Sequence, residues 1–124
     1  MPIALRVDRE RGLVTTTVWD HVTYEEIQSH LSEEEHLRAT GYPELIDAMA
    51  ASTTLTADEV RAIVRRTHDI LRRGPFGPTA IASDNDVVYG MARMYQILAE
   101  RDGISIGVFR SVAEAEHWLR GDGR

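Results

Sequence analysis

The sequence contains no cysteine and no lysine among its 124 residues. Without cysteine the chain has no disulfide framework, no thiolate nucleophile and no Cys-based zinc or iron–sulfur site. All 14 basic side chains are arginine, and 20 carboxylates give a formal net charge of −6. This balance argues against a dedicated nucleic-acid-binding protein, because phosphate contacts need a net basic face.

Long hydrophobic runs are also missing. No window approaches the roughly 18 uncharged apolar residues of a membrane span, and residues 1–12 hold no apolar core long enough for a signal peptide. We therefore expect a cytoplasmic protein. The length and an apolar content of 43% fit one domain over residues 1–120, with residues 121–124 as a frayed C-terminal tail.

The hydrophobic pattern at the start of the chain indicates two strands. Residues 3–8 alternate apolar and polar side chains, and residues 13–19 are rich in β-branched side chains and end in Trp19. The polar loop between them ends in Gly12, so we expect an antiparallel hairpin.

The rest of the chain alternates helical and strand patterns. Capping boxes at Thr23, Thr56 and Ser111, and a polar cap at Asp84 or Asn85, begin four helices. Further strands are expected at residues 44–50, 78–83 and 104–109. The predicted fold class is α/β: a single-domain mixed sheet of about five strands, with an N-terminal antiparallel hairpin, mainly parallel strands after it, and four helices.

Two segments carry a resemblance to a known family. Residues 88–95 (VYGMARMY) and 108–119 (VFRSVAEAEHWL) resemble the SpoIIAA-like family of small bacterial STAS/SEC14-type proteins. The resemblance implies a scaffold that binds proteins or, in SEC14-like relatives, lipids, and it implies no enzyme. In the related anti-sigma-factor antagonists a serine in an Asp-Ser-Ser-Gly type turn is phosphorylated. Ala57 or Asp58 stands at that position here, so the resemblance gives no support for a phosphorylation switch.

In open α/β sheets, ligands bind beyond the carboxyl ends of the parallel strands. Two other features are a carboxylate, Asp47, inside an apolar strand, and Tyr89 and Arg93 one helical turn apart. The rule and these features together select the candidate ligand-binding residues Asp47, Ser52, Thr53, Thr54, Asp84, Asn85, Tyr89, Arg93 and Arg110. The alternative is that most of these polar groups only cap helices. Gly90 lies inside a helical pattern, where we expect a close packing contact to compensate for its cost.

Charge is segregated between two of the predicted helices. Residues 23–40 carry a net charge of −4 and residues 56–73 a net charge of +2. One hypothesis is docking of a second copy or of an anionic membrane surface through an arginine surface formed by Arg61, Arg65, Arg66, Arg72 and Arg73. The alternative is that the two helices neutralise each other.

Signatures of catalysis and metal binding are few. Of the five histidines, His30 is singled out as a metal ligand that could share an ion with a carboxylate at helical spacing, either Glu33 or Glu34, and the sequence has no HExxH, Gly-x-Ser-x-Gly or phosphate-binding glycine loop. We expect no metal, no cofactor and no catalytic residues. The predicted function is a non-catalytic, regulatory binding domain for a protein partner or a small amphipathic ligand, as a homodimer. The alternatives are SEC14-like lipid or peripheral membrane binding and, ranked last, a hydrolase or lyase built on Asp47, Tyr89 and Arg93.

Overall fold

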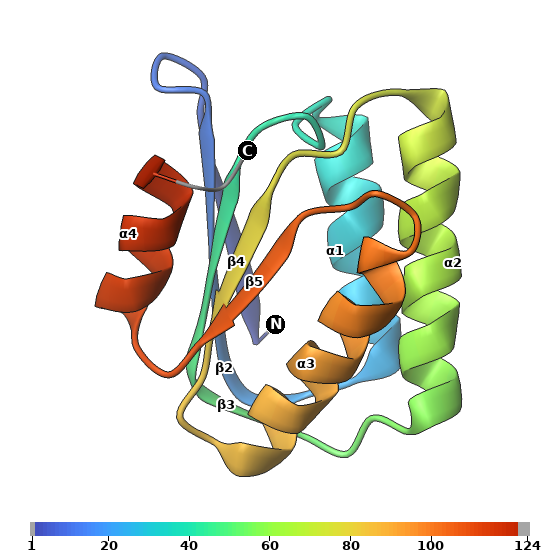
Figure 1. Ribbon diagram of the computed structural model, residues 1–124, viewed down its shortest axis with the longest axis vertical. Helices are drawn as coiled ribbons and strands as arrows, with labels where there is room; N and C mark the ends of the chain where they lie inside the picture. Colours follow the sequence, from blue (N-terminus) through green and yellow to red (C-terminus); the bar gives the residue numbers. More distant parts are fainter. Residues whose placement is uncertain (1, 122–124) are drawn as a thin grey trace.

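The computed structural model describes residues 2–121 as one five-stranded sheet with four helices (Figure 1). Its elements are, in chain order, β1 (Ile3–Asp8), β2 (Leu13–Val22), α1 (Tyr24–His36), β3 (Glu44–Thr53), α2 (Ala57–Arg73), β4 (Thr79–Ala82), α3 (Asp86–Glu100), β5 (Ile106–Phe109) and α4 (Val112–Gly121).

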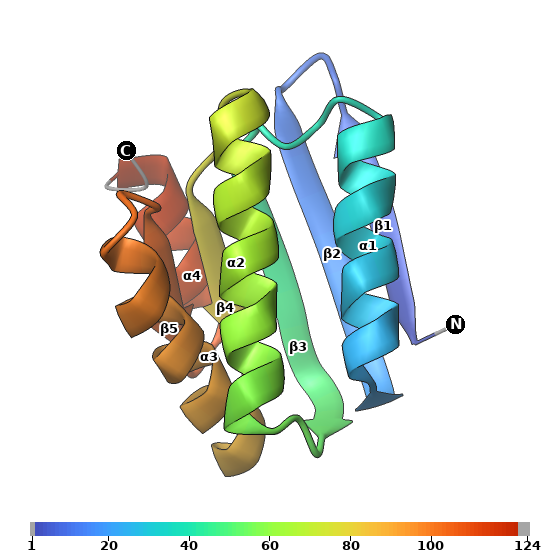
Figure 2. The ribbon, with the colours of Figure 1, turned by 90° about the vertical axis from the view of Figure 1, so that its right-hand side faces the viewer.

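The strands lie in the sheet in the same order as in the chain. β1 pairs with β2 antiparallel, and β2, β3, β4 and β5 then pair in parallel. Crossovers between parallel strands are almost always right-handed. Because each crossover here adds the next strand on the same side, α1, α2 and α3 all lie on one face of the sheet (Figures 1 and 2).

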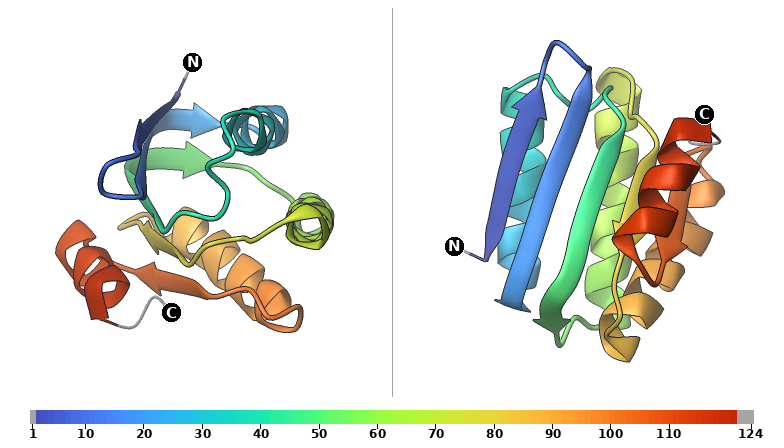
Figure 3. Two further views of the ribbon diagram at one scale, coloured as in Figure 1. Left: turned by 90° about the horizontal axis from the view of Figure 1, so that it is seen from above. Right: turned by 90° about the vertical axis from the view of Figure 1, so that its left-hand side faces the viewer.

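The opposite face carries a single helix. α4 follows β5 and folds back over β4 and β5, where Ala115 packs with Leu45, Ala80 and Ala82 (Figure 3). Figure 3 shows that β1 and β2 have no helix over them on this side. The β2 side chains that point there include the exposed Thr17, and such polar side chains suit a sheet face in water.

A β-bulge interrupts the pairing of β2 and β3. Thr17 is opposite Asp47, but Trp19 is opposite Ala50, so β3 carries one extra residue. The Asp47 carboxylate accepts a hydrogen bond from the backbone N–H of Met49 at 3.1 Å, and this bond stabilises the irregular backbone. Because of this extra residue, Ala51 after the bulge points to the same face of the sheet as Ile46 and Ala48 before it.

The predicted fold class is confirmed, and so are the hairpin and the capping boxes at Thr23 and Thr56. Asn85 caps α3 by accepting from the N–H groups of Val87 and Val88. Several boundaries differ: β2 continues to Val22 and β3 to Thr53 instead of ending at residues 19 and 50, β4 and β5 are shorter than the expected ranges 78–83 and 104–109, and α4 includes Gly121, the first residue of the expected tail. Residues 122–124 of that tail lie outside the described residues. In the part of the chain described here, no helix has both the length and the apolar character needed to cross a membrane.

The prediction of a close packing contact at Gly90 is wrong. Gly90 is exposed on α3, and a Cβ atom built on it would have no neighbour within 4 Å. Gly77 provides the contrast, since a Cβ atom there would lie 2.3 Å from the carbonyl oxygen of Tyr42. The chain therefore needs a glycine at position 77 and has no packing need for one at position 90.

Gly90→Ala should raise the free energy of unfolding by about 0.5–1 kcal/mol, because alanine restricts the unfolded chain and favours the helix without a clash. The measurement is urea unfolding followed by tryptophan fluorescence. The matched control Gly77→Ala should destabilise the protein. An unchanged or lower stability of Gly90→Ala would show that this glycine has a structural role.

Candidate functional site

A cavity of about 160 Å³ lies between the sheet and the helices α1, α2 and α3, which cover one of its faces. Its walls are almost entirely apolar and come from β1, β2, β3, β4, α1, α2 and α3, including Val18, Ile27, Ile46, Ile63, Ile81 and Ala92. Binding sites for small molecules are mostly apolar cavities with a few polar groups, and this cavity is smaller than the roughly 300–1,000 Å³ that a drug-sized ligand occupies.

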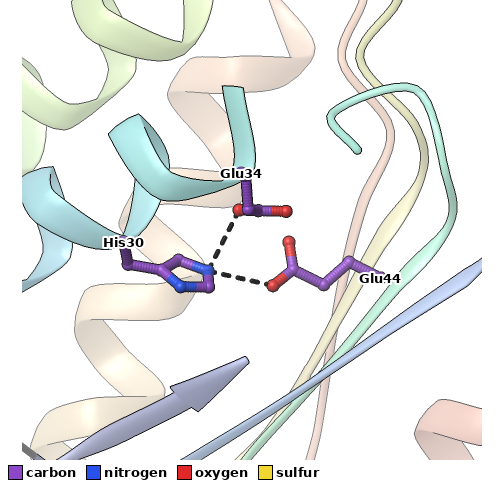
Figure 4. A group of neighbouring side chains, drawn as sticks. All are labelled: His30, Glu34 and Glu44. Atoms are coloured by element: carbon purple, nitrogen blue, oxygen red, sulfur yellow. Dashed lines mark hydrogen bonds and ion pairs between the residues drawn. The ribbon is translucent and has the colours of Figure 1, made fainter. Parts of the chain in front are cut away.

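A buried polar cluster of His30, Glu34 and Glu44 forms part of the cavity wall (Figure 4). His30 Nε2 lies 3.0 Å from Glu34 Oε1 and 3.1 Å from Glu44 Oε2. The two glutamates are only 3% and 4% exposed. Thr16 on β2 donates a hydrogen bond of 2.5 Å to Glu44 Oε2. Four polar side chains from α1, β2 and β3 thus meet in an otherwise apolar setting.

The cluster is incompletely hydrogen-bonded. One imidazole nitrogen carries at most one proton, so Nε2 serves only one of the two carboxylates, and its hydrogen bond goes to Glu44. Within residues 2–121, Glu34 Oε1 and His30 Nδ1 are buried without a hydrogen-bond partner. Buried polar groups in native proteins are nearly all paired, and the exceptions often mark functional sites.

Local sequence explains why these charged residues are buried. On α1, His30 and Glu34 are one turn apart, and Glu34 continues the apolar face of Ile27 and Leu31. On β3, Glu44 points to the same face as Ile46 and Ala48, because alternate residues of a strand share a face.

The environment shifts the pKa of each member. Burial opposes a charge on His30, but the adjacent carboxyl groups of Glu34 and Glu44 outweigh it and raise the pKa of His30 to about 10. Burial, together with the charge of Glu44, raises the pKa of Glu34 to about 8. Burial also disfavours ionised Glu44, but His30 lowers its pKa overall. At neutral pH the cluster therefore holds a charged imidazole, an ionised Glu44 and a protonated Glu34.

A second polar contact lies in the cavity wall. The Tyr95 hydroxyl on α3 is 3.1 Å from Thr67 Oγ1 on α2, and Thr67 also donates to the carbonyl oxygen of Ile63. Burial raises the pKa of Tyr95, so the phenol stays neutral. This contact joins α2 and α3 over the cavity.

The polar cluster lies at the opposite end of the strands from the predicted crevice. Glu44 is the first residue of β3 and is paired with Thr79, the first residue of β4. The cluster is thus near the amino ends of the parallel strands, whereas the sequence argument placed the ligand at their carboxyl ends.

The predicted residues at the carboxyl ends bond mainly to their own neighbourhood. Thr53 Oγ1 donates to the carbonyl oxygen of Val22 at 2.9 Å, and Thr54 Oγ1 lies 3.3 Å from His21 Nε2. Ser52, expected in a loop, lies in β3. Asn85 caps α3. The alternative interpretation, in which these groups only cap helices, describes Asn85, whereas Thr53 bonds to the last residue of β2.

Three further candidates meet outside the cavity. Arg110 donates to Asp86 Oδ1 at 2.8 Å and to the carbonyl oxygen of Asp84 at 3.5 Å, and its guanidinium lies 3.8 Å from the ring centre of Tyr89. Arg93 donates to Gln96. This group ties the end of β5 to the start of α3.

The structure does not bring together the three residues of the hydrolase or lyase hypothesis. Asp47 lies between Ile46 and Ala48, both of which line the cavity, so its side chain points to the opposite face of the sheet. Tyr89 and Arg93 belong to α3 on the cavity side. Asp47 was expected to be buried, but it is half-buried and bonds to Met49.

Most of the arginine surface is used in ion pairs within the chain. Arg66 and Arg73 on α2 both bind Glu35 on α1, and these contacts lower the pKa of Glu35, chiefly through the hydrogen bond from Arg73. Arg61 pairs with Asp58 and Arg72 with Asp69, while Arg65 is exposed. The two helices of opposite charge lie side by side, as the neutralisation alternative expected (Figure 2).

Sequence reasoning noticed His30 and Glu34 but not their partner Glu44. Residues 33–35 are all glutamates, but of the three only Glu34 is buried, because it has the helical spacing of the apolar face. Glu44 was assigned to the start of a strand, and its alternation with Ile46 and Ala48 was the signal that it faces the core.

The cluster predicts a pH dependence of stability. The folded state keeps the Glu34 proton up to a pH of about 8, whereas the unfolded carboxyl loses it near 4.5. Between these values the folded state binds the extra proton, so the free energy of unfolding falls as pH rises. His30 adds to this fall only above its unfolded value of 6.5.

The test is urea unfolding between about pH 5 and pH 6.5. The native protein should lose stability with rising pH, by at most about 1.4 kcal/mol per unit for one proton. Glu34→Gln should flatten this slope, because the amide does not titrate. Glu33→Gln, an exposed neighbour on the same helix, should keep it. Equal slopes in both variants would contradict the assignment.

The comparisons with known proteins agree on the fold. No family model matches the chain, and no match was found among curated proteins. One similar solved structure is the crystal structure of an uncharacterized protein of the DUF3478 family with a SpoIIAA-like fold from Shewanella loihica. It has a TM-score of 0.59 at 16% sequence identity, over 94% of this chain and 93% of that chain. The resemblance seen in the sequence is thus confirmed at the level of architecture: this chain has the SpoIIAA-like fold.

Proposed function

We propose that this protein binds a small, mainly apolar molecule that carries one polar group, in the cavity between the sheet and α1, α2 and α3. The observation that carries the proposal is the combination of an apolar cavity with one buried polar cluster in its wall. Ligand sites typically combine apolar walls with a few convergent polar groups and shifted pKa values.

The volume limits the size of the ligand. Apolar cavities of about 150 Å³ hold a molecule the size of benzene, and this cavity measures about 160 Å³. A lipid with a long acyl chain needs more room, and α1, α2 or α3 would have to move away from the sheet to admit it. The volume of the cavity therefore favours a ligand with one ring or a short chain over a complete lipid.

The charge of the cluster limits the polar group of the ligand. At neutral pH protonated Glu34 can donate a hydrogen bond, while ionised Glu44 can accept one. A hydroxyl group both donates and accepts, so it suits this environment. An anionic group would be repelled by Glu44 and would lose its hydration on entering an apolar space. We infer a neutral, hydroxyl-bearing ligand.

The proposed activity is binding, in a regulatory role, and not catalysis. The polar groups of the cluster are held by one another and by Thr16. The residues considered for a hydrolase or lyase lie on different faces of the sheet.

Phenol is a suitable probe because it combines a ring of the right size with one hydroxyl group. Titration into the ¹⁵N-labelled full chain should shift resonances of residues that line the cavity, with benzene binding more weakly and benzoate not binding. Ala92→Leu should weaken phenol binding at least tenfold, since Ala92 lines the cavity and the larger side chain fills it.

The matched control is Ala113→Leu, an exposed position on α4 on the other side of the sheet, which should leave binding unchanged. Urea unfolding would show that both variants are folded. Phenol shifts scattered over the surface, or equal binding by Ala92→Leu, would refute the proposal.

A further inference from the structure

His30, Glu34 and Glu44 also have the arrangement of a metal site. His30 and Glu34 present their side chains from consecutive turns of α1, and Glu44 faces them from the first position of β3. One ligand atom from each lies within 4.8 Å of the others. Helical i, i+4 spacing completed by a third ligand from another element is a common way to hold a cation.

The distances match those between neighbouring ligands around one metal. Two ligands at right angles on a cation, with bonds of about 2.1–2.2 Å, lie about 3.0–3.1 Å apart. His30 Nε2 is 3.0 Å from Glu34 Oε1 and 3.1 Å from Glu44 Oε2.

The hydrogen bonding of the cluster favours a cation over hydrogen bonds alone. Glu34 is 3% exposed, and its Oε1 points at His30 Nε2 (Figure 4) but accepts no hydrogen bond from any described residue. A buried carboxylate oxygen without a donor is costly. A cation among the three groups would satisfy both carboxylates and the Nε2 lone pair at once.

The charge balance points the same way. When His30 ligates as a neutral imidazole and both glutamates as carboxylates, the three groups bring two negative charges into a site with apolar walls, and a buried charge needs a counter-charge. A divalent cation supplies two positive charges at one point. Thr16 donates to Glu44 Oε2, and such a hydrogen bond from outside the ligand set is typical of metal-binding carboxylates.

We propose that His30, Glu34 and Glu44 together bind one divalent first-row metal ion at the wall of the cavity. This revises the sequence expectation of no metal. One nitrogen and two carboxylate oxygens, with no sulfur, suit Mn²⁺, Fe²⁺ or Zn²⁺. Three protein ligands leave positions on the ion for water or for the polar group of a molecule in the cavity. Metal binding does not require that molecule, but it replaces the Glu34 proton, so the hydroxyl group of a ligand would then bind an open position of the ion instead of the Glu34 carboxyl.

The test is calorimetric titration of the full chain with Mn²⁺ and with Zn²⁺ at pH 7.5, after removal of metals with EDTA. One equivalent of metal should bind. Glu34→Gln keeps the size of the side chain but removes a charged ligand, and it should weaken binding at least tenfold. Glu33→Gln, one residue away and exposed, is the matched control and should bind as the native protein does.

A second readout locates the ion. The imidazole ¹⁵N resonances of His30 should shift on metal addition, while those of the other four histidines stay in place. The absence of binding by either metal up to 1 mM, equal weakening by Glu33→Gln, or shifts at a different histidine would overturn the proposal. Because Glu34→Gln is nearly isosteric, the test does not depend on whether a His30 variant folds.

Discussion

The handedness of the strand crossovers is the constraint on which this structure depends. Three right-handed connections, each adding a strand on the same side, bring α1, α2 and α3 to one face of the sheet. Helices α1, α2 and α3 and strands β1 to β4 line one mainly apolar space, and their side chains leave about 160 Å³ of it unfilled. On the other face only α4 packs, through small residues of β4 such as Ala80 and Ala82. The two faces therefore differ: three helices and the cavity lie on one face, and the short helix α4 covers part of the other.

The two sides of α1 also differ in how their charged residues are paired. Its outer side carries Glu35, which binds two arginines of α2 in partly exposed ion pairs of modest strength. Its inner side carries His30 and Glu34, which are both removed from water, and the charge of His30 is balanced within the protein by Glu44. The adjacent residues Glu34 and Glu35 thus have opposite pKa shifts, because one is buried beside another carboxylate and the other faces guanidinium groups.

The sequence was sufficient for the architecture because each element has a local cause. Capping boxes at Thr23 and Thr56 begin helices, and alternation in residues 3–8 and 13–19 marks the hairpin. The polar cluster was not predicted. His30 and Glu44 are 14 positions apart and belong to different elements, so only tertiary packing brings them together. Glu34 resembles its solvated neighbours in composition, and only its place on the helical face differs. The general rule for ligands at the carboxyl ends of strands selects the other end of the sheet, since the buried polar groups lie near the amino ends.

The bulge in β3 also bears on how chains of different length can share this site. Met49 is the additional residue opposite Val18, and it is partly exposed. A chain without Met49 would regain regular pairing with β2. Glu44, Ile46 and Ala48, which precede the bulge, and Ala51 and Thr53, which follow it, would all still face the cavity. A one-residue gap at this point of an alignment is therefore compatible with an unchanged cavity, whereas a gap between Glu44 and Ala48 would turn the carboxylate to the other face of the sheet.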